Sequence, residues 1–229
     1  MKPNKDQKTI SLGAMMTGGA RVIQRDRQLR DWYPTPSDVT QALINVHPVA
    51  GMTLWEPCCG DGSMSKVLEK AGAVVICSDI MPLIEGAYTQ DFLTTTQMPD
   101  GATGIVTNPP YKLAAQFIEH AMNMKPDFVA MLLKSTFWHA ARRYTIWRKY
   151  RPSHIHPLLW RPDFLNLGAP AMDFMWACWI ADHSGPTVYE PLPRPGIYVR
   201  GDGALVGTTV ARTQTQERNG EPDGRLPMR

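Results

Sequence analysis

The sequence has 229 residues and a formal net charge of +3, and 43% of its residues are hydrophobic while 20% are charged. This composition is that of an ordinary globular protein, and the length suffices for one large core. A membrane-spanning chain is excluded, because no run approaches the ~20 apolar residues that cross a bilayer. The first residues also lack the apolar centre of an export signal, so we expect a cytoplasmic protein with no membrane partner.

The positive charge is concentrated at the start of the chain. Residues 1–30 contain seven Lys or Arg and two Asp, and we predict that they form a basic N-terminal arm. Residues 31–181 show the periodic apolar pattern of a folded domain. Residues 182–229 are rich in Pro and Gly and predict a largely irregular C-terminal tail, in which Gly201-Asp202-Gly203 is suited to turn a small hairpin.

The folded domain is predicted to begin with a helix. Thr35 has the side chain of a helix N-cap, and Pro36 suits the first helical position. Apolar residues follow at helical spacing over 39–46. His47 precedes Pro48, and this pair ends the helix because a residue before proline avoids the helical conformation.

Strands and helices then alternate along the middle of the chain. Apolar strands are predicted at 53–55, 73–77, 104–107 and 128–133, with helices between them. This alternation predicts an α/β fold with a mostly parallel sheet that is covered on both faces. Two later apolar runs, 155–160 and 174–180, have no crossover helix between them, which favours an antiparallel hairpin at one edge of the sheet.

A turn with two glycines follows the first predicted strand. Glycines there let a ligand approach the backbone, and ligands of open parallel sheets bind beyond the carboxyl ends of the strands. A dinucleotide fold would have a third glycine where this chain has Ser65, and a carboxylate would repel a pyrophosphate. The pattern favours S-adenosylmethionine, whose ammonium and sulfonium groups a carboxylate attracts. The candidate contacts in this turn are Glu56, Pro57, Cys58, Gly60 and Gly62.

Acidic residues recur at the following strand ends. Asp79 closes the second predicted strand, where a carboxylate accepts hydrogen bonds from ribose hydroxyls. Ile80 comes next and is suited to pack on an adenine ring. Asp91 and Phe92 precede the next strand, and a carboxylate at that place can accept from the adenine amino group. We predict that all four residues contact the cofactor.

The segment Asn108-Pro109-Pro110-Tyr111 follows the strand at 104–107 and carries the predicted catalytic residues. An aromatic amine is a poor nucleophile because its lone pair is spread into the ring. The Asn108 side-chain oxygen and the Pro109 carbonyl can accept its two hydrogens, which opposes that spreading and stabilises the developing positive charge. The prolines stiffen the turn, and Tyr111 can stack on a flat target.

A second basic cluster lies between residues 142 and 151, where aromatic residues are interleaved with the charges. Basic groups beside aromatic rings suit contact with phosphates and stacking on bases. A solvated helix face with its aromatic residues in the core is the alternative interpretation. The candidate nucleic-acid contacts are Arg142, Arg143, Arg148, Lys149 and Arg151.

The cysteines and histidines predict neither disulfides nor a metal site. The four cysteines form no CxxC pair, and reduced thiols are expected in a cytosolic protein. His154 and His156 alternate with apolar residues and have no third ligand nearby in the sequence. We therefore expect no bound metal.

The two central motifs resemble those of the Rossmann-like S-adenosylmethionine-dependent amino-methyltransferases. The likeness runs from about Trp32 to Ile180 and is strongest to the DNA adenine-N6 enzymes often found in phages. Asn108–Tyr111 is similar to that family's catalytic tetrapeptide, Glu56–Gly62 to its cofactor loop, and Tyr33–Pro36 to the segment that holds the methionine end of the cofactor. The resemblance implies a sheet of seven strands with the last one reversed, and it implies that Tyr33 and Thr35 contact the cofactor. It also implies that the protein works in the cytoplasm of a bacterial or phage-infected cell.

The resemblance also leaves alternatives. The chain has no insertion large enough for a separate target-recognition region, so weak or short sequence specificity is expected. DNA adenine N6 is the leading target, followed by RNA adenine, while cytosine-N4 enzymes more often have Ser at the position of Asn108. A protein glutamine methyltransferase and a catalytically idle cofactor-binding module are the other hypotheses.

Overall fold

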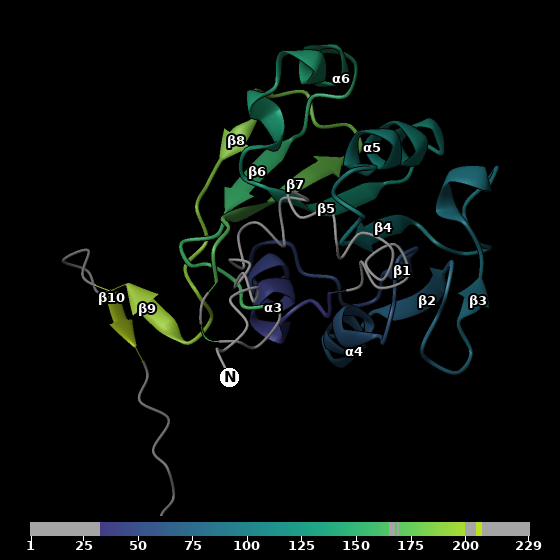
Figure 1. The fold of residues 1–229 in the computed structure, drawn as a ribbon, viewed down its shortest axis with the longest axis horizontal. Helices are drawn as coiled ribbons and strands as arrows, with labels where there is room; N and C mark the ends of the chain where they lie inside the picture. Colours follow the sequence, from purple (N-terminus) through teal and green to yellow (C-terminus); the bar gives the residue numbers. More distant parts are fainter. Residues whose placement is uncertain (1–32, 165–167, 169, 200–204, 208–229) are drawn as a thin grey trace, which may run out of the picture. The chain divides into compact units, whose positions relative to one another are not determined.

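An eight-stranded sheet organises the computed structural model, which describes residues 33–164, 168, 170–199 and 205–207. The predicted basic arm, residues 1–30, lies outside the described residues. The strands are β1 (Thr53–Glu56), β2 (Val74–Asp79), β3 (Tyr88–Thr89), β4 (Gly104–Thr107), β5 (Phe128–Lys134), β6 (His154–Pro157), β7 (Phe174–Ile180) and β8 (Val188–Tyr189). Their order across the sheet is β3-β2-β1-β4-β5-β7-β6-β8 (Figure 1).

One strand of the sheet runs against the others. β7 pairs antiparallel with β5 on one side and with β6 on the other, while the remaining neighbours pair in parallel. The predicted α/β class with a mostly parallel sheet is confirmed. Two details differ from the prediction. The sheet has eight strands and not seven, and the reversed strand lies inside the sheet and not at its edge.

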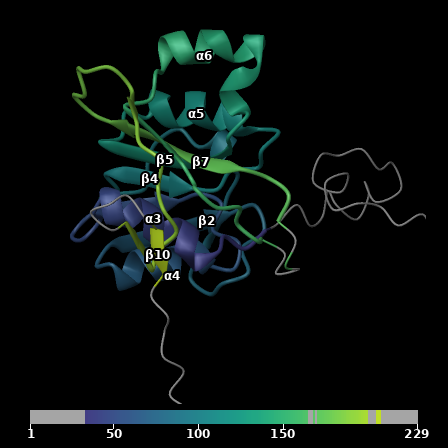
Figure 2. The same ribbon diagram turned by 90° about the vertical axis from the view of Figure 1, so that its left-hand side faces the viewer.

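Helices cover both faces of the sheet, as predicted. Helices α3 (Ser37–Val46) and α4 (Ser63–Lys70) lie on one face, and α5 (Ala114–Asn123) and α6 (Tyr144–Lys149) lie on the other (Figures 1 and 2). Short 3-10 turns occur at Phe92–Thr94, Phe137–His139 and Ala141–Arg143.

Successive residues of the central strands supply two separate hydrophobic cores. In β5, Ala130 and Leu132 pack toward α3 and α4, whereas Val129 and Met131 pack toward α5. Six of the seven residues of β7 are buried, because this strand has neighbours at both edges and helices on both faces.

Helix α3 begins and ends close to the predicted positions, but its first turn is built differently. Its N-cap is Pro36, with no side-chain capping bond, and its C-cap is His47. The predicted cap, Thr35, bonds a distant residue described below. The first turn of the helix is tied to the sheet, since the indole N–H of Trp176 donates to the Val39 carbonyl over 3.0 Å.

The main compact unit extends beyond the predicted boundary at residue 181 and reaches Pro195. The extension arises because β8 adds to the sheet beside β6, and because Leu158 bridges Leu192. The second unit, Gly196–Arg229, contains β9 (Ile197–Val199) and β10 (Leu205–Gly207), which pair antiparallel. This pairing fits the predicted hairpin, although Gly201-Asp202-Gly203 itself lies outside the described residues.

No helix in the described part of the chain is both long and apolar enough to cross a membrane.

Candidate active site

Several predicted site residues come together at the carboxyl ends of the central parallel strands. Glu56 and Asp79 end β1 and β2, and Asn108 follows β4, while Lys134, which the sequence did not predict, ends β5. These four strands are parallel and lie side by side in the order β2-β1-β4-β5, with about 4.8 Å between neighbours. The carboxyl ends of the strands therefore place a cofactor loop and a candidate catalytic turn next to each other.

The glycine-containing turn is fixed by the carboxylate at the end of β2. Gly60 donates its backbone N–H to Asp79 Oδ2 over 3.0 Å, and Met81 donates to Asp79 Oδ1 over 2.9 Å. Gly60 and Gly62 have φ of +51° and +72°, in the left-handed region that favours glycine. A Cβ at Gly62 would also lie 3.2 Å from Ile84 Cδ1. Both glycines are thus required by the local backbone.

Glu56 lies at the predicted strand end, but its carboxyl group is enclosed. The side chain is 2% exposed, and the Ser65 hydroxyl donates to Oε2. Burial raises the pKa of Glu56 well above its usual range, against the opposing effect of the Ser65 hydrogen bond. The Ser65 hydrogen bond joins the end of β1 to α4 beneath the loop. The contact between Glu56 and the cofactor stays a prediction.

The other residues of the loop are also mostly enclosed. Pro57 is buried, and Cys58 is half-buried against the core on the α5 side of the sheet. Burial and the nearby Asp79 charge raise the pKa of Cys58, so this thiol stays protonated. Tyr33 is half-buried and packs on the core beneath α3.

The predicted adenine-binding residues divide into two groups. Ile80 is 64% exposed beside Asp79, and Asp91 is exposed, with Oδ1 accepting from the Leu93 N–H over 2.9 Å. Phe92 is 1% exposed and packs against Trp55 with ring centroids 5.1 Å apart. The Phe92 side chain therefore belongs to the core and not to a ligand surface, which corrects the prediction for this side chain and leaves only its backbone for contact.

Asn108 is held by Thr35, which lies just before α3. Its Nδ2 donates to Thr35 Oγ1 over 3.1 Å, which fixes the amide plane. Its Oδ1 is buried, and no donor among the described residues bonds to it. A buried amide oxygen without a donor costs about 1–3 kcal/mol, so this oxygen is available to accept from an N–H group. Thr35 is 6% exposed and acts here as a support for Asn108.

The remainder of the tetrapeptide forms a stiff turn into α5. Pro109 is buried, and the Pro110 carbonyl accepts from the Leu113 N–H over 2.8 Å. The Tyr111 ring is half-buried and lies 5.5 Å from the ring of Phe174, and Lys134 Nζ lies 5.0 Å from its centroid. The sequence analysis missed Lys134, although a single lysine at the end of an apolar strand was a visible signal.

The basic segment, residues 142–151, connects the carboxyl end of β5 to the amino end of β6. The Arg143 guanidinium lies 4.4 Å from the ring of Phe137, just after β5. Lys149 forms a salt bridge with Glu119 over 3.1 Å. Glu119 lies in the second half of α5, the half that is further along the chain from Asn108. Arg151 donates to the Gly185 carbonyl over 3.4 Å. Arg142 and Arg148 are exposed. The five residues thus form an extended row and not one compact patch.

Known proteins support the fold at low sequence identity. No known protein family and no curated protein matches the sequence. The structure is similar to a type I restriction-modification methyltransferase subunit from Streptococcus thermophilus, with a TM-score of 0.56 and 14% identity over 77% of this chain and 50% of that one. It is also similar to the modification subunit of a proposed type I restriction enzyme from Vibrio vulnificus YJ016, with a TM-score of 0.54 and 16% identity over 80% and 52% of the two chains.

A third similar structure is a proposed class I S-adenosylmethionine-dependent methyltransferase from Listeria monocytogenes, with a TM-score of 0.51 and 14% identity over 77% of this chain and 68% of that one. The present chain spans about half the length of the two restriction-system subunits. These likenesses, together with the strand order, show that the chain has the α/β Rossmann-like methyltransferase fold.

Proposed function

We propose that this chain transfers a methyl group from S-adenosylmethionine to the N6 amino group of adenine in DNA, with weak or short sequence specificity. The observation that carries the proposal is the buried Oδ1 of Asn108, an acceptor with no donor among the described residues. It lies directly after β4, beside the cofactor loop that follows β1. An exocyclic amino group supplies the donor that this oxygen lacks.

The chemistry follows from the two acceptors of the turn. Asn108 Oδ1 and the Pro109 carbonyl bind the two hydrogens of the target amine, so that its lone pair is directed away from the ring and toward the methyl donor. With the cofactor bound, the amine nitrogen would take the methyl group as the methyl–sulfur bond breaks and its electron pair stays on sulfur, and the fixed oxygens would stabilise the positive charge on the amine. One proton then leaves the nitrogen for solvent. The Thr35 hydroxyl accepts from Nδ2 and so holds the amide with Oδ1 available to the substrate.

The residues around the glycine turn fit an adenosine-containing cofactor. Asp79 is a half-exposed carboxylate that accepts from Gly60 and Met81, and further lone pairs remain for ribose hydroxyls. The exposed Ile80 offers an apolar surface for the adenine ring, and Asp91 offers an acceptor for its amino group. When bound, the cofactor supplies a methyl group on a positively charged sulfur.

A nucleic-acid substrate is supported by the row of basic residues. Of the five, only Lys149 forms a salt bridge within the described part of the chain, which leaves four cations for phosphates. Similarity to restriction-system methyltransferase subunits favours DNA. The target base has to be flipped from the duplex or met in a single strand to reach Asn108.

Nucleoside mass spectrometry tests the proposal. Unmethylated DNA and RNA of the same sequence are incubated separately with the protein and an isotopically labelled cofactor, and then digested. We expect labelled N6-methyladenine from DNA. The matched control is Asn45→Ala, which removes an exposed amide of α3 and should leave the product unchanged. Labelled N4-methylcytosine, label only in RNA, or no labelled base from either polymer would overturn the proposal.

A further inference from the structure

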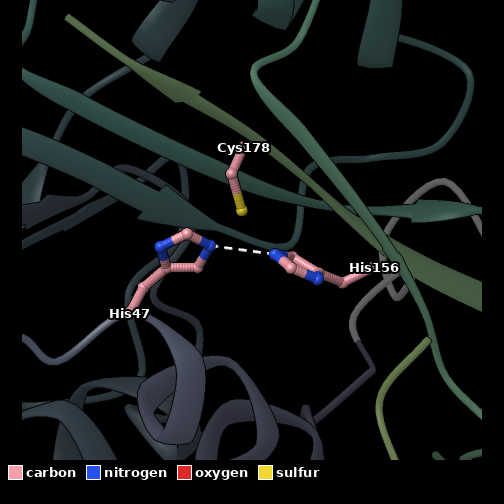
Figure 3. A group of neighbouring side chains, drawn as sticks. All are labelled: His47, His156 and Cys178. Carbon is pink, nitrogen blue, oxygen red and sulfur yellow. Dashed lines mark hydrogen bonds between the residues drawn. The ribbon is translucent and has the colours of Figure 1, made fainter. Parts of the chain in front are cut away.

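Three metal-binding side chains meet between helix α3 and the sheet (Figure 3). His47 ends α3, His156 belongs to β6 and Cys178 belongs to β7. Their ligand atoms all lie within 4.8 Å of one another. The residues are far apart in the sequence, so the folded sheet supplies the third ligand that the sequence did not show beside His156.

The hydrogen bonds around His156 leave one ring nitrogen ready for a metal. Its Nδ1 lies 2.9 Å from the Glu190 carbonyl oxygen, which can only accept, so Nδ1 carries the hydrogen. The lone pair of Nε2 therefore points to His47, whose Nε2 lies 2.9 Å away. A histidine that donates from one nitrogen to a carbonyl and presents the other is the common arrangement of a metal ligand.

The surroundings also suit this chemistry. Cys178 is 0% exposed and His156 is 1% exposed, so bulk water does not compete at these two positions. His47 is half-buried, and its Nε2 faces the Nε2 of His156 at 2.9 Å. His154 stacks on His156 with ring centroids 5.6 Å apart and completes a histidine-rich environment.

We propose that His47, His156 and Cys178 form a binding site for a single zinc ion. Cys sulfur and His nitrogen are the ligands that zinc prefers in proteins, and tetrahedral geometry separates such ligand atoms by about 3.3–3.6 Å. The two Nε2 atoms lie 2.9 Å apart and all three ligand atoms lie within 4.8 Å of one another, which brackets this spacing. On binding, the Cys178 thiol loses its proton to solvent and forms the Zn–S bond, and a water molecule on the half-exposed His47 side supplies the fourth ligand.

The location indicates that the ion stabilises the fold. The ion joins the end of α3 to β6 and β7, where His47 already lies 5.5 Å from the ring of Phe128. The start of the same helix follows Thr35, the residue that holds Asn108. A bound ion therefore fixes the whole helix against the sheet, and its loss should lower thermal stability.

Metal analysis and cobalt spectroscopy of the wild-type full-length chain test the proposal first. Protein purified without chelators from zinc-supplemented medium should contain about one zinc per chain. Zinc-free protein titrated with Co²⁺ should show a tetrahedral d–d spectrum and a sulfur-to-cobalt charge-transfer band, and zinc should abolish both. Added zinc should raise the melting temperature. Substoichiometric metal with no charge-transfer band would overturn the proposal without any variant.

Variants then assign the ligands. Cys178→Ser should lose the charge-transfer band and weaken Co²⁺ binding at least 10-fold, and His156→Ala should weaken it similarly, with folding checked by circular dichroism. Cys77→Ser and His183→Gln remove a thiol and an imidazole from outside the group and should bind normally. A charge-transfer band that persists in Cys178→Ser, or disappears in Cys77→Ser, would contradict the assignment.

Discussion

Asn108 donates its side-chain N–H to the hydroxyl of Thr35 over 3.1 Å, although 73 positions separate the two residues. This bond engages the side-chain nitrogen, while the buried Oδ1 has no donor among the described residues. The pair therefore links the segment before α3 to the candidate catalytic turn after β4.

Thr35→Val tests this link. Valine keeps the volume but removes the hydroxyl, so the Asn108 amide loses its support while its oxygen remains. Losing one hydrogen bond is worth about 1 kcal/mol, and we expect the single-turnover methylation rate to fall about 5-fold with unchanged cofactor affinity. The matched control is Thr40→Val, which removes a buried hydroxyl of α3 that has no described partner. Equal rates for the two variants would show that Thr35 does not position Asn108.

The pKa of Glu56 predicts a pH-dependent stability. Because burial raises this pKa in the folded state, folding takes up a proton above the usual value of 4.5, and stability falls as pH rises through the interval between the two values. Glu56→Gln removes that proton uptake. The melting temperature of the variant should be higher than that of wild type at pH 8 and close to that of wild type at pH 4.

The control for this measurement is Glu69→Gln, which changes an exposed carboxylate of α4. Its melting temperature should track the wild type at both pH values. If Glu56→Gln and Glu69→Gln shift equally at pH 8, the buried carboxyl is not the source of the effect.

Asp79 is predicted to act on the cofactor and not on the target amine. Asp79→Asn removes a charged acceptor that also orders the Gly60 and Met81 N–H groups. Hydrogen bonds to charged groups are the stronger ones, so calorimetry should show about a 10-fold or greater loss of cofactor affinity. The rate at saturating cofactor should stay near that of wild type. Asp100→Asn, which alters an exposed carboxylate outside the site, should change neither quantity.

The basic row is predicted to contact phosphates. Arg142 and Arg148 are exposed and form no salt bridge within the part of the chain that the structure describes. Replacing either with Ala should weaken DNA binding and reduce the slope of log K against log salt by about 1. Lys70→Ala removes an exposed charge from the last turn of α4 and should leave the slope unchanged. An unchanged slope for both arginine variants would exclude this row as the DNA-binding surface.

The sequence predicted the elements best where apolar residues run without interruption. The strands β4 and β7 begin and end at the predicted residues, because both are buried on two faces. The prediction placed β7 at the edge of the sheet, whereas it lies between β5 and β6. The absence of a crossover helix indicates an antiparallel pair but does not show which strand lies further inside the sheet. The unbroken apolar run of β7 was the signal for an internal strand.

Long-range contacts explain the other differences. A threonine before a helix looks the same in sequence whether it caps that helix or holds Asn108, so the role of Thr35 required the folded chain. His47 and Cys178 reach His156 only through the packing of α3 on the sheet. Phe92 differs for a similar reason, because the aromatic rings that enclose it come from β1 and α5.

The rate of methyl transfer by Asn108→Ala tests the central claim most directly. The measurement pairs single-turnover kinetics on unmethylated DNA with calorimetry of the cofactor, using Asn45→Ala as the matched control. The account predicts a rate at least about 100-fold below wild type, as for the loss of one preorganised polar group at a reacting centre, with cofactor affinity nearly unchanged. A variant that methylates DNA at the wild-type rate would contradict the assignment of Asn108 Oδ1 as the acceptor of the target amine.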